Sequence, residues 1–147
     1  MVHEMIKLRT NPDPSLRIPA KPVKKFNIDI RMKISDMVKT MVKIDNAIGL
    51  ASRQVNIVED IIVILNPDDN RIYALCNAKI VKEEGSQIGQ EGCLSLPGMT
   101  IEKERPEQVK VVYQDEYGVK KVIKGKGLLA RLLCHEIDHN KGILMID

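Results

Sequence analysis

Apolar residues between positions 28 and 44 recur at the spacing of an amphipathic helix. Ile34, Met37, Val38 and Met41 follow the i, i+3, i+4, i+7 pattern, and lysines occupy the other side. The pattern predicts a helix over residues 28–44 whose Met and Ile stripe packs against the core.

A second helix is predicted near the carboxyl end, after Gly127. The segment up to His135 contains no proline and no run of β-branched residues. Apolar side chains would cover two sides of this helix, with Leu128 and Leu132 on the side of His135. A helix that is apolar around most of its circumference is a buried one, so we expect it in the core.

Alternation of apolar and polar residues predicts strands in the rest of the chain. The expected strands are residues 60–65, 71–82, 109–113 and 119–124, the last two joined as a hairpin. Prolines up to Pro22 keep the amino end extended. Together the elements predict an α+β fold in which mixed or antiparallel strands pack around the buried helix, with the helix of residues 28–44 outside.

Composition sets limits on this fold and its surroundings. The 147 residues are enough for one domain with its own core, which we expect to span residues 1–147. A net charge of +3 with interspersed signs argues only weakly for an anionic partner, and we expect no sequence-specific nucleic-acid binding. The odd number of cysteines indicates a reducing compartment, and no apolar run approaches the roughly 18 residues that cross a membrane.

The predicted carboxyl-terminal helix carries two histidines at the spacing of metal ligands. His135 and His139 are four residues apart, so they differ by roughly 40° around the helix axis and can face one ion. Glu136 lies about 60° beyond His139, beside the ion rather than between its ligands. That place suits a carboxylate that handles protons in a hydrolase of the H-E-x-x-H type.

Two histidines leave a catalytic site of this type in need of one more protein ligand, with a fourth position open. Asp147 is the only carboxylate downstream of His139, which disfavours a third ligand from that part of the chain. Cys134 points about 100° away from His135 and cannot join both histidines on one ion. Cys93, in a loop flanked by glycine, is the best candidate.

Small residues gather at positions 46–55, where the backbone can approach a neighbouring group closely. Gln54 follows them and offers a side-chain amide as a hydrogen-bond donor. By itself the stretch is a weak indication of a site above a tight turn.

Three segments in this order resemble the motifs of the peptide deformylases, the metal hydrolases that remove the formyl group from the initiating methionine. They are AIGLASRQ at residues 47–54, EGCLS at residues 91–95 and HEIDH at residues 135–139. The resemblance extends from residues 11–17 to residues 142–144, and so covers nearly the whole chain. Three ordered motifs are far more specific than any one of them.

The resemblance implies that one divalent metal ion is bound by Cys93, His135 and His139. The ion would be Fe(II) in the cell, with Zn(II), Ni(II) or Co(II) as alternatives. Glu136 would take a proton from the attacking water and pass it to the leaving amine. The developing oxyanion would be held by the metal, the Gln54 side chain and the Leu94 N–H.

The resemblance also implies a substrate groove. Gly49 and Leu50 would present backbone to the peptide in a strand-like pairing, and the methionine pocket would be lined by Ile48, Leu128 and Leu132. The partners would be an N-formylmethionyl nascent peptide and, transiently, the ribosome. The expected compartment is the cytosol of a bacterium or of a virus-infected host, or an organelle matrix after removal of a transit peptide.

Three further residues are expected to support the site. Glu91 and Arg105 match an ion pair of the family that braces the cysteine loop. Asp138 is a structural candidate beside the ligands.

Five residues depart from the family pattern, namely Ala47, Ser52, Arg53, Cys134 and Asn140. Ala47 would be strained if its position needs a positive φ. Arg53 would place a charge near the substrate groove. None of the five is a ligand or a proposed catalytic group, so the chemistry should survive.

Two other functions compete with a deformylase. A zinc endopeptidase also uses H-E-x-x-H on a helix, but no downstream third ligand is available for it. A deformylase-like protein with altered or lost activity would keep the metal only to hold its fold, and a closed site with four ligands would favour that role.

Overall fold

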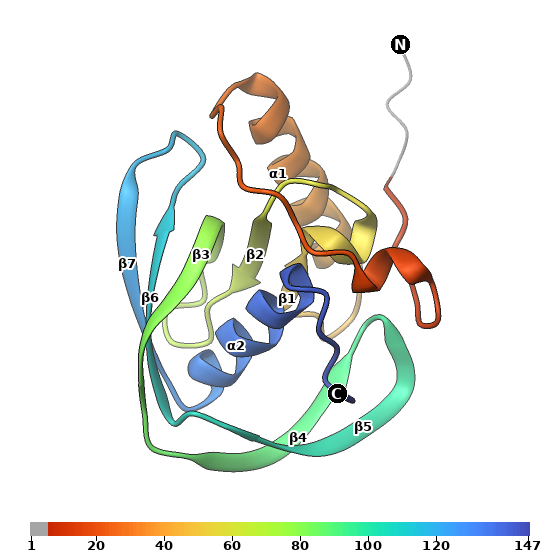
Figure 1. The fold of residues 1–147 in the computed structure, drawn as a ribbon, viewed down its shortest axis with the longest axis vertical. Helices are drawn as coiled ribbons and strands as arrows, with labels where there is room; N and C mark the ends of the chain where they lie inside the picture. The colour runs from red at the N-terminus through yellow and green to blue at the C-terminus, as the bar shows by residue number, and fades with distance from the viewer. Residues whose placement is uncertain (1–5) are drawn as a thin grey trace.

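The computed structural model describes residues 6–147 and shows an α+β fold around one buried helix (Figure 1). The helical elements are α1 (Ile28–Val42), α2 (Leu128–Asn140) and the 3-10 turns η1 (Pro14–Arg17) and η2 (Ser52–Val55). The strands are β1 (Gly49–Ala51), β2 (Ile61–Leu65), β3 (Ile72–Glu84), β4 (Gln87–Cys93), β5 (Leu96–Arg105), β6 (Gln108–Gln114) and β7 (Lys120–Lys126). Helix α2 lies in the middle, between α1 and the β4–β5 hairpin.

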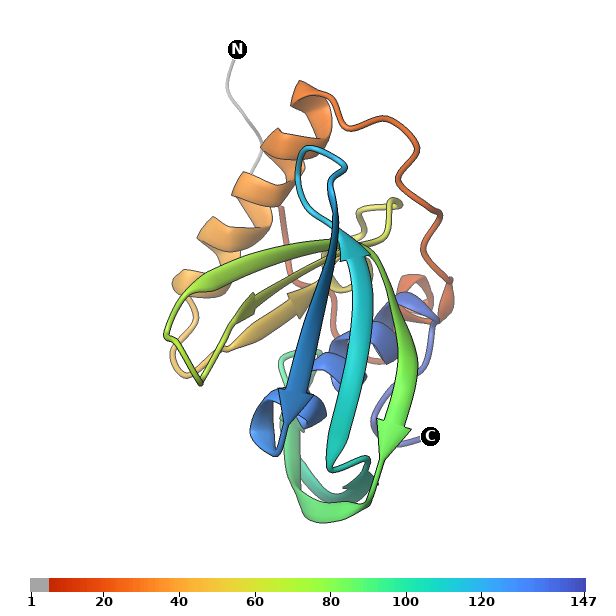
Figure 2. The same ribbon diagram turned by 90° about the vertical axis from the view of Figure 1, so that its left-hand side faces the viewer.

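Both sheets are antiparallel, which settles the choice between mixed and antiparallel strands. The larger sheet has the order β1-β2-β3-β6-β7, and β4 pairs with β5 alone. The first part of strand β3 pairs with β2 and the rest pairs with β6. Its register with β6 shifts between Cys76 and Lys79. Asn77 occupies this irregularity with a φ of 54°, and its side chain donates to the Val23 carbonyl. The sheet can therefore curve around α2 (Figure 2).

Strand β2 lies between the two helices, which explains its uninterrupted apolar sequence. Ile61 and Val63 belong to the core beside α1, whereas Ile62 and Ile64 belong to the core beside α2. All four side chains are fully buried. Such a strand needs apolar residues on both faces, so simple alternation does not describe it.

Helix α1 confirms the predicted amphipathic helix. The Asn27 side chain accepts a hydrogen bond from the Ile30 N–H and caps its first turn. Ile34, Met37 and Met41 are buried, as their spacing predicts. The helix ends at Val42, two residues before the predicted end.

Helix α2 is enclosed almost completely, because 11 of its 13 residues are buried. Its close approach to β7 depends on Gly125. A Cβ at that position would lie 3.0 Å from Leu133 Cδ1 and 3.1 Å from the backbone nitrogen of Ala130. No helix within residues 6–147 has the length and apolar character needed to cross a bilayer.

The β4–β5 hairpin replaces the loop predicted around Cys93. Few of its side chains are apolar and buried, so the period-two signal of a half-buried strand is weak there. Glu91 and Arg105, on neighbouring strands, instead turn charged groups into the interior. Side-chain hydrogen bonds to α2 therefore hold this hairpin in place more than an apolar face does.

We expect Gly125→Val to destabilise the protein by about 1–3 kcal/mol, because the added side chain meets the α2 backbone and cannot be relieved by a rotamer change. Urea denaturation would measure the loss. Val122→Ile, at an exposed position of the same strand, is the control and should leave the midpoint nearly unchanged. Equal midpoints for the two variants would contradict the close packing of β7 on α2.

Candidate active site

Helix α2 and strand β4 bring three metal-ligand side chains together. His135 and His139 lie one turn apart on α2, with ring centroids 5.0 Å apart. Cys93 ends β4, and its Sγ lies 3.1 Å from Nε2 of His139. The ligand atoms of the three residues all lie within 4.8 Å of one another.

The donor set fits a divalent cation. One thiolate sulfur and two imidazole nitrogens suit metals of borderline softness, and three protein ligands leave a coordination position open. The Nδ1 atom of His135 lies 2.8 Å from Glu91 Oε1, which leaves Nε2 free to face the cluster. Burial opposes a charge on His135, but hydrogen bonds with Cys93 and Glu91 outweigh it and raise its pKa to about 10. A bound cation would take the place of this proton.

His139 has the opposite electrostatic environment. Burial, followed by the nearby charges of His135 and Arg105, lowers the pKa of His139 to about 3. The imidazole is therefore neutral and keeps a lone pair for a cation. Its Nδ1 is buried and has no hydrogen-bond partner within residues 6–147.

Glu136 is a buried carboxylate with one oxygen left unpaired. Its side chain lies against Gly49, where a Cβ would come within 2.4 Å of Glu136 Oε2. The other oxygen, Oε1, has no hydrogen-bond partner among the described residues. Burial raises the pKa of Glu136 to about 7. An unpaired buried acceptor is costly, and this one is available to a proton donor that enters the site.

Gln54 is held at the edge of the cluster by hydrogen bonds at both ends of its amide. Its Oε1 accepts from the Ala51 N–H at 2.9 Å, and its Nε2 donates to Ser95 Oγ at 3.1 Å. The same Nε2 lies 3.8 Å from Cys93 Sγ. Leu94, whose N–H was the other predicted oxyanion donor, follows Cys93 directly in the turn between β4 and β5.

The Glu91 carboxylate joins the hairpin to α2. Arg105 donates to both of its oxygens, at 2.8 and 2.9 Å, and Arg131 donates to Oε2 at 2.5 Å. Burial opposes ionisation of Glu91, but the hydrogen bonds from Arg105 and His135 outweigh it and hold its pKa well below the ordinary value. Arg105 also donates to Asp138 at 2.7 Å.

Two residues of this site were not selected from the sequence. Arg131 lies four residues before His135 on α2, so helical spacing alone would have placed it on the ligand side. Ser95 belongs to the EGCLS segment, but its hydrogen bond to Gln54 depends on the tertiary fold. Both side chains orient a predicted site residue rather than add a new ligand.

The residues predicted to bind substrate lie in or next to β1 and on α2. Gly49 and Leu50 lie in β1, an edge strand of the larger sheet, and the Leu50 side chain packs toward α1. Leu132 is buried and lies 2.6 Å from where a Cβ of Gly49 would be. Ile48 is partly buried against the same core. Leu128 is 53% exposed at the first turn of α2.

The structure corrects the expectation about Arg53 and answers the condition that was set for Ala47. Arg53 is buried, and its guanidinium donates to the carbonyls of Ile18 and Ile57, at 2.8 and 3.0 Å. It therefore ties η2 to the amino-terminal segment instead of charging the substrate groove. Ala47 is not among the residues with a positive φ, although its neighbour Asn46 has a φ of 64°, so the condition for strain at Ala47 is not met.

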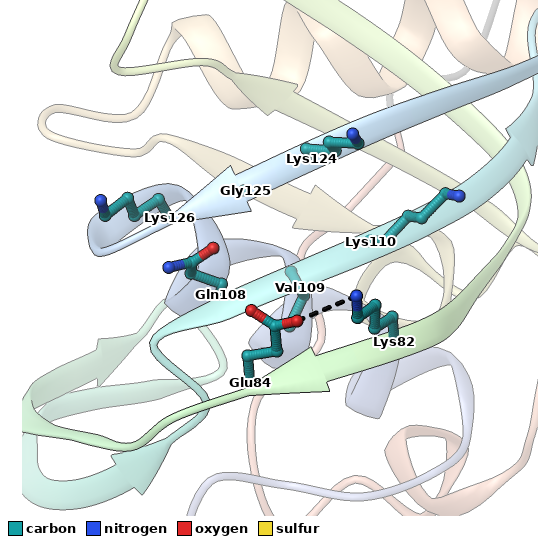
Figure 3. Close-up of a pocket in the computed structure, with 8 residues that line it drawn as sticks. All are labelled: Lys82, Glu84, Gln108, Val109, Lys110, Lys124, Gly125 and Lys126. Atoms are coloured by element: carbon teal, nitrogen blue, oxygen red, sulfur yellow. Dashed lines mark ion pairs between the residues drawn. The ribbon is translucent and has the colours of Figure 1, made fainter.

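A separate hollow lies on the outer face of the larger sheet and contains none of the predicted site residues (Figure 3). It is lined by Lys82, Glu84, Gln108, Val109, Lys110, Lys124, Gly125 and Lys126. Lys82 and Glu84 form an exposed ion pair of 2.9 Å there. The candidate active site is on the other side of this sheet, at α2.

Comparison with known proteins gives a consistent result for nearly the whole chain. The family model for polypeptide deformylase matches residues 5–147. A peptide deformylase of Caldanaerobacter subterraneus subsp. tengcongensis is 48% identical over 135 residues, covering 92% of this chain and 83% of that protein. One from Alkaliphilus metalliredigens is 46% identical and covers 95% and 93%. The crystal structure of the Thermotoga maritima peptide deformylase has a TM-score of 0.92 at 36% identity, covering 99% and 97%.

The fold and the comparisons define a metal-dependent hydrolase. The chain belongs to the polypeptide deformylase family and is similar to its members along almost its full length. The family implies a single catalytic metal ion, and the Cys-His-His cluster is a site that fits one.

We expect Glu91→Gln to cost about 3–5 kcal/mol of unfolding free energy, because it removes the counter-charge of the buried Arg131 guanidinium and leaves Arg105 with Asp138 alone. Chemical denaturation at neutral pH would measure the change. Lys82→Gln breaks an exposed ion pair instead and should change stability by less than about 1 kcal/mol. A similar small loss in Glu91→Gln would show that the hairpin does not depend on this carboxylate.

Proposed function

We propose that residues 1–147 form a single catalytic domain that removes the formyl group from N-formylmethionyl nascent peptides and releases formate. The observation that carries the proposal is the meeting of Cys93, His135 and His139, together with the buried and unpaired Oε1 of Glu136, the residue next to His135 on α2. Membership of the family supports both the substrate and the reaction.

Cys93, His135 and His139 would hold one divalent cation. The mixed sulfur and nitrogen donors are compatible with Fe(II), which we propose for the cell, and with Zn(II), Ni(II) or Co(II). When bound, such an ion polarises the formyl carbonyl and makes a water molecule more acidic. Glu91 orients His135 by accepting a hydrogen bond at Nδ1, and so directs Nε2 to the ion.

Glu136 would act as the proton carrier of the reaction. Its Oε1 is buried and unpaired, so it can accept the proton of the attacking water without first breaking another hydrogen bond. The same oxygen would then give the proton to the amine nitrogen as the formyl–nitrogen bond breaks. Gly49 leaves the space in which this carboxylate sits.

Gln54 and Leu94 would stabilise the negative charge that develops on the formyl oxygen. Ser95 orients the Gln54 Nε2 at the edge of the ligand cluster. The Leu94 N–H belongs to the residue next to the Cys93 ligand. Donors that are fixed before the reaction do not have to reorganise as charge develops.

The substrate peptide would pair with the free edge of β1 through the backbone of Gly49 and Leu50. The methionine side chain would lie against Ile48 and Leu132, and Leu128 would border the opening because it is half exposed. Since the substrate is a nascent chain, we propose a transient association with the ribosome. The location would be a bacterial or virus-infected host cytosol, or an organelle matrix.

A zinc endopeptidase and a deformylase-like protein without activity remain the competing functions. Cys93 argues against the first, because the structure already brings it to the two histidines as a third donor. The unpaired Glu136 argues against the second, because a purely structural metal site has no use for a buried, unsatisfied carboxylate oxygen.

We expect protein prepared anaerobically with Fe(II) to release formate from formyl-Met-Ala-Ser, and Glu136→Ala to lower kcat by about 10²–10⁴-fold while keeping its metal. Glu104→Ala, at an exposed position, is the control and should retain the parent rate. Removing the metal with a chelator should abolish release, and adding it back should restore it. Absence of release from folded, metal-loaded protein would contradict the proposal, and cleavage of an internal bond in an unformylated peptide would favour the endopeptidase.

Gly49→Ala tests the position of the Glu136 carboxylate. The added methyl would lie 2.4 Å from Oε2 and 2.6 Å from Leu132 Cδ1, so the carboxylate must move. We expect kcat to fall by about 10²-fold with the metal content unchanged, because displacing a reacting group by about 1 Å has an effect of that order. Gly92→Ala adds the same methyl in ordinary contact, 3.7 Å from Thr100 Cγ2, and serves as the control. An equal kcat in both variants would mean that Glu136 is not held where the reaction needs it.

A further inference from the structure

Asn140, the last residue of α2, has a buried side chain with all its hydrogen-bonding groups in use. Its Oδ1 accepts from Ser52 Oγ and from the Arg53 N–H, each at 3.2 Å. Its Nδ2 donates to Asp60 Oδ1 at 2.8 Å and to the Ile61 carbonyl at 3.1 Å. One side chain thus joins the end of α2 to η2 and to the start of β2.

The position of Asn140 in the chain makes this junction relevant to the active site. It directly follows the ligand His139, and its partners Ser52 and Arg53 directly precede Gln54. The path from the ligand helix to the proposed oxyanion donor therefore crosses a single hydrogen bond, either that from the Arg53 N–H or that from the Ser52 hydroxyl. No other side-chain hydrogen bond recorded in residues 6–147 connects α2 with η2.

The amino-terminal segment covers the same junction. The Ala20 N–H donates to the Asn140 carbonyl at 2.8 Å, and the Arg9 N–H donates to the Gln54 carbonyl at 2.6 Å. The Arg53 guanidinium donates to the Ser15 carbonyl at 3.0 Å. The segment therefore shields the hydrogen bonds of Asn140 from water, which strengthens them and makes the loss of a partner costly.

We infer that Asn140 is a positioning residue that fixes the Gln54 amide relative to the metal-ligand helix. The inference rests on the proposed role of Gln54. A 3-10 turn of four residues has few hydrogen bonds of its own, so its orientation depends on outside contacts. Asn140 provides two such contacts at the first half of η2, and Gln54 lies in the second half.

A leucine at position 140 would fill a similar volume but would offer no acceptor. The Arg53 N–H would then be buried without a partner, and the Ser52 hydroxyl would lose its acceptor while still accepting from the Ile61 N–H, so η2 would have to shift to recover hydrogen bonds. His135, His139 and Cys93 do not use these contacts, so the ligand set should stay in place. The expected defect is therefore in transition-state stabilisation and not in metal binding.

The test compares Asn140→Leu with Lys141→Leu, which places the same side chain at the exposed neighbouring position. We expect Asn140→Leu to lower kcat for formyl-Met-Ala-Ser by about tenfold, part of the roughly 10²–10³-fold effect of deleting an oxyanion donor. KM should change by less than about twofold, and the absorption spectrum of the Co(II) form should match that of the parent protein. Lys141→Leu should keep the parent kcat.

A double-mutant cycle separates positioning from a general loss of stability. If Asn140 acts through Gln54, Asn140→Leu should have little further effect on kcat in a Gln54→Ala background. If the fold-losses in kcat of the two single variants multiply in the double variant, the inference is overturned. A changed Co(II) spectrum or an unchanged kcat in Asn140→Leu would also overturn it. An unchanged kcat in Gln54→Ala would instead contradict the proposed role of Gln54, and an inactive parent protein would contradict the proposed reaction.

The exchange Asp60→Asn with Asn140→Asp provides a second variant in case the leucine variant does not fold. It keeps an acceptor for Ser52 and Arg53 at position 140, and the residue at position 60 becomes the donor instead of the acceptor. The hydrogen bond to the Ile61 carbonyl of β2 is lost, which should lower stability without removing a contact to η2. We expect kcat of the exchange variant to lie within about threefold of the parent, because the hydrogen bonds to η2 are retained. A loss as large as that in Asn140→Leu would overturn the inference.

Discussion

The active site depends on one buried carboxylate, Glu91. The β4–β5 hairpin has little apolar surface to hold it against the rest of the molecule, and Glu91 compensates by binding Arg131 and His135 of α2. The hydrogen bonds from Arg105 and His135 outweigh the desolvation of this carboxylate, so the group remains charged in the interior. The same charge fixes the tautomer of His135. A single ion cluster thus determines where Cys93 meets α2 and which nitrogen His135 presents.

Close approach of the sheet to α2 is the second requirement. The larger sheet curves around the helix, and each of its edge strands carries a glycine at the point of contact, Gly49 on β1 and Gly125 on β7. A side chain at Gly49 would occupy the place of the Glu136 carboxylate, and one at Gly125 would meet the helix backbone. Because these two glycines have no Cβ, both edge strands of the sheet can approach α2 this closely.

Much of this arrangement could be predicted, because it follows from helical geometry. The spacing of His135, Glu136 and His139 is local, and the absence of a suitable downstream ligand left Cys93 as the third donor. The strand pattern of β6 and β7 and the amphipathic pattern of α1 are also local. The β4–β5 hairpin was missed because two of its three buried positions, Glu91 and Arg105, are charged. The burial of Arg53 was missed because its partners are backbone carbonyls of a distant segment, which no spacing rule identifies.

Three of the residues that depart from the family pattern meet in the structure. Ser52 and Arg53 of η2 both donate to Asn140. A polar residue at position 140 would be unfavourable among the buried residues of α2 unless it had donors to bind, and the Ser52 hydroxyl would be costly without an acceptor. Ser52 and Asn140 are therefore understandable as a pair. Residue 53 joins them through its backbone N–H, whereas the Arg53 side chain is satisfied by the carbonyls of Ser15, Ile18 and Ile57. The result is one buried hydrogen-bond network beside the ligand helix, and it leaves Cys93 and Glu136 undisturbed.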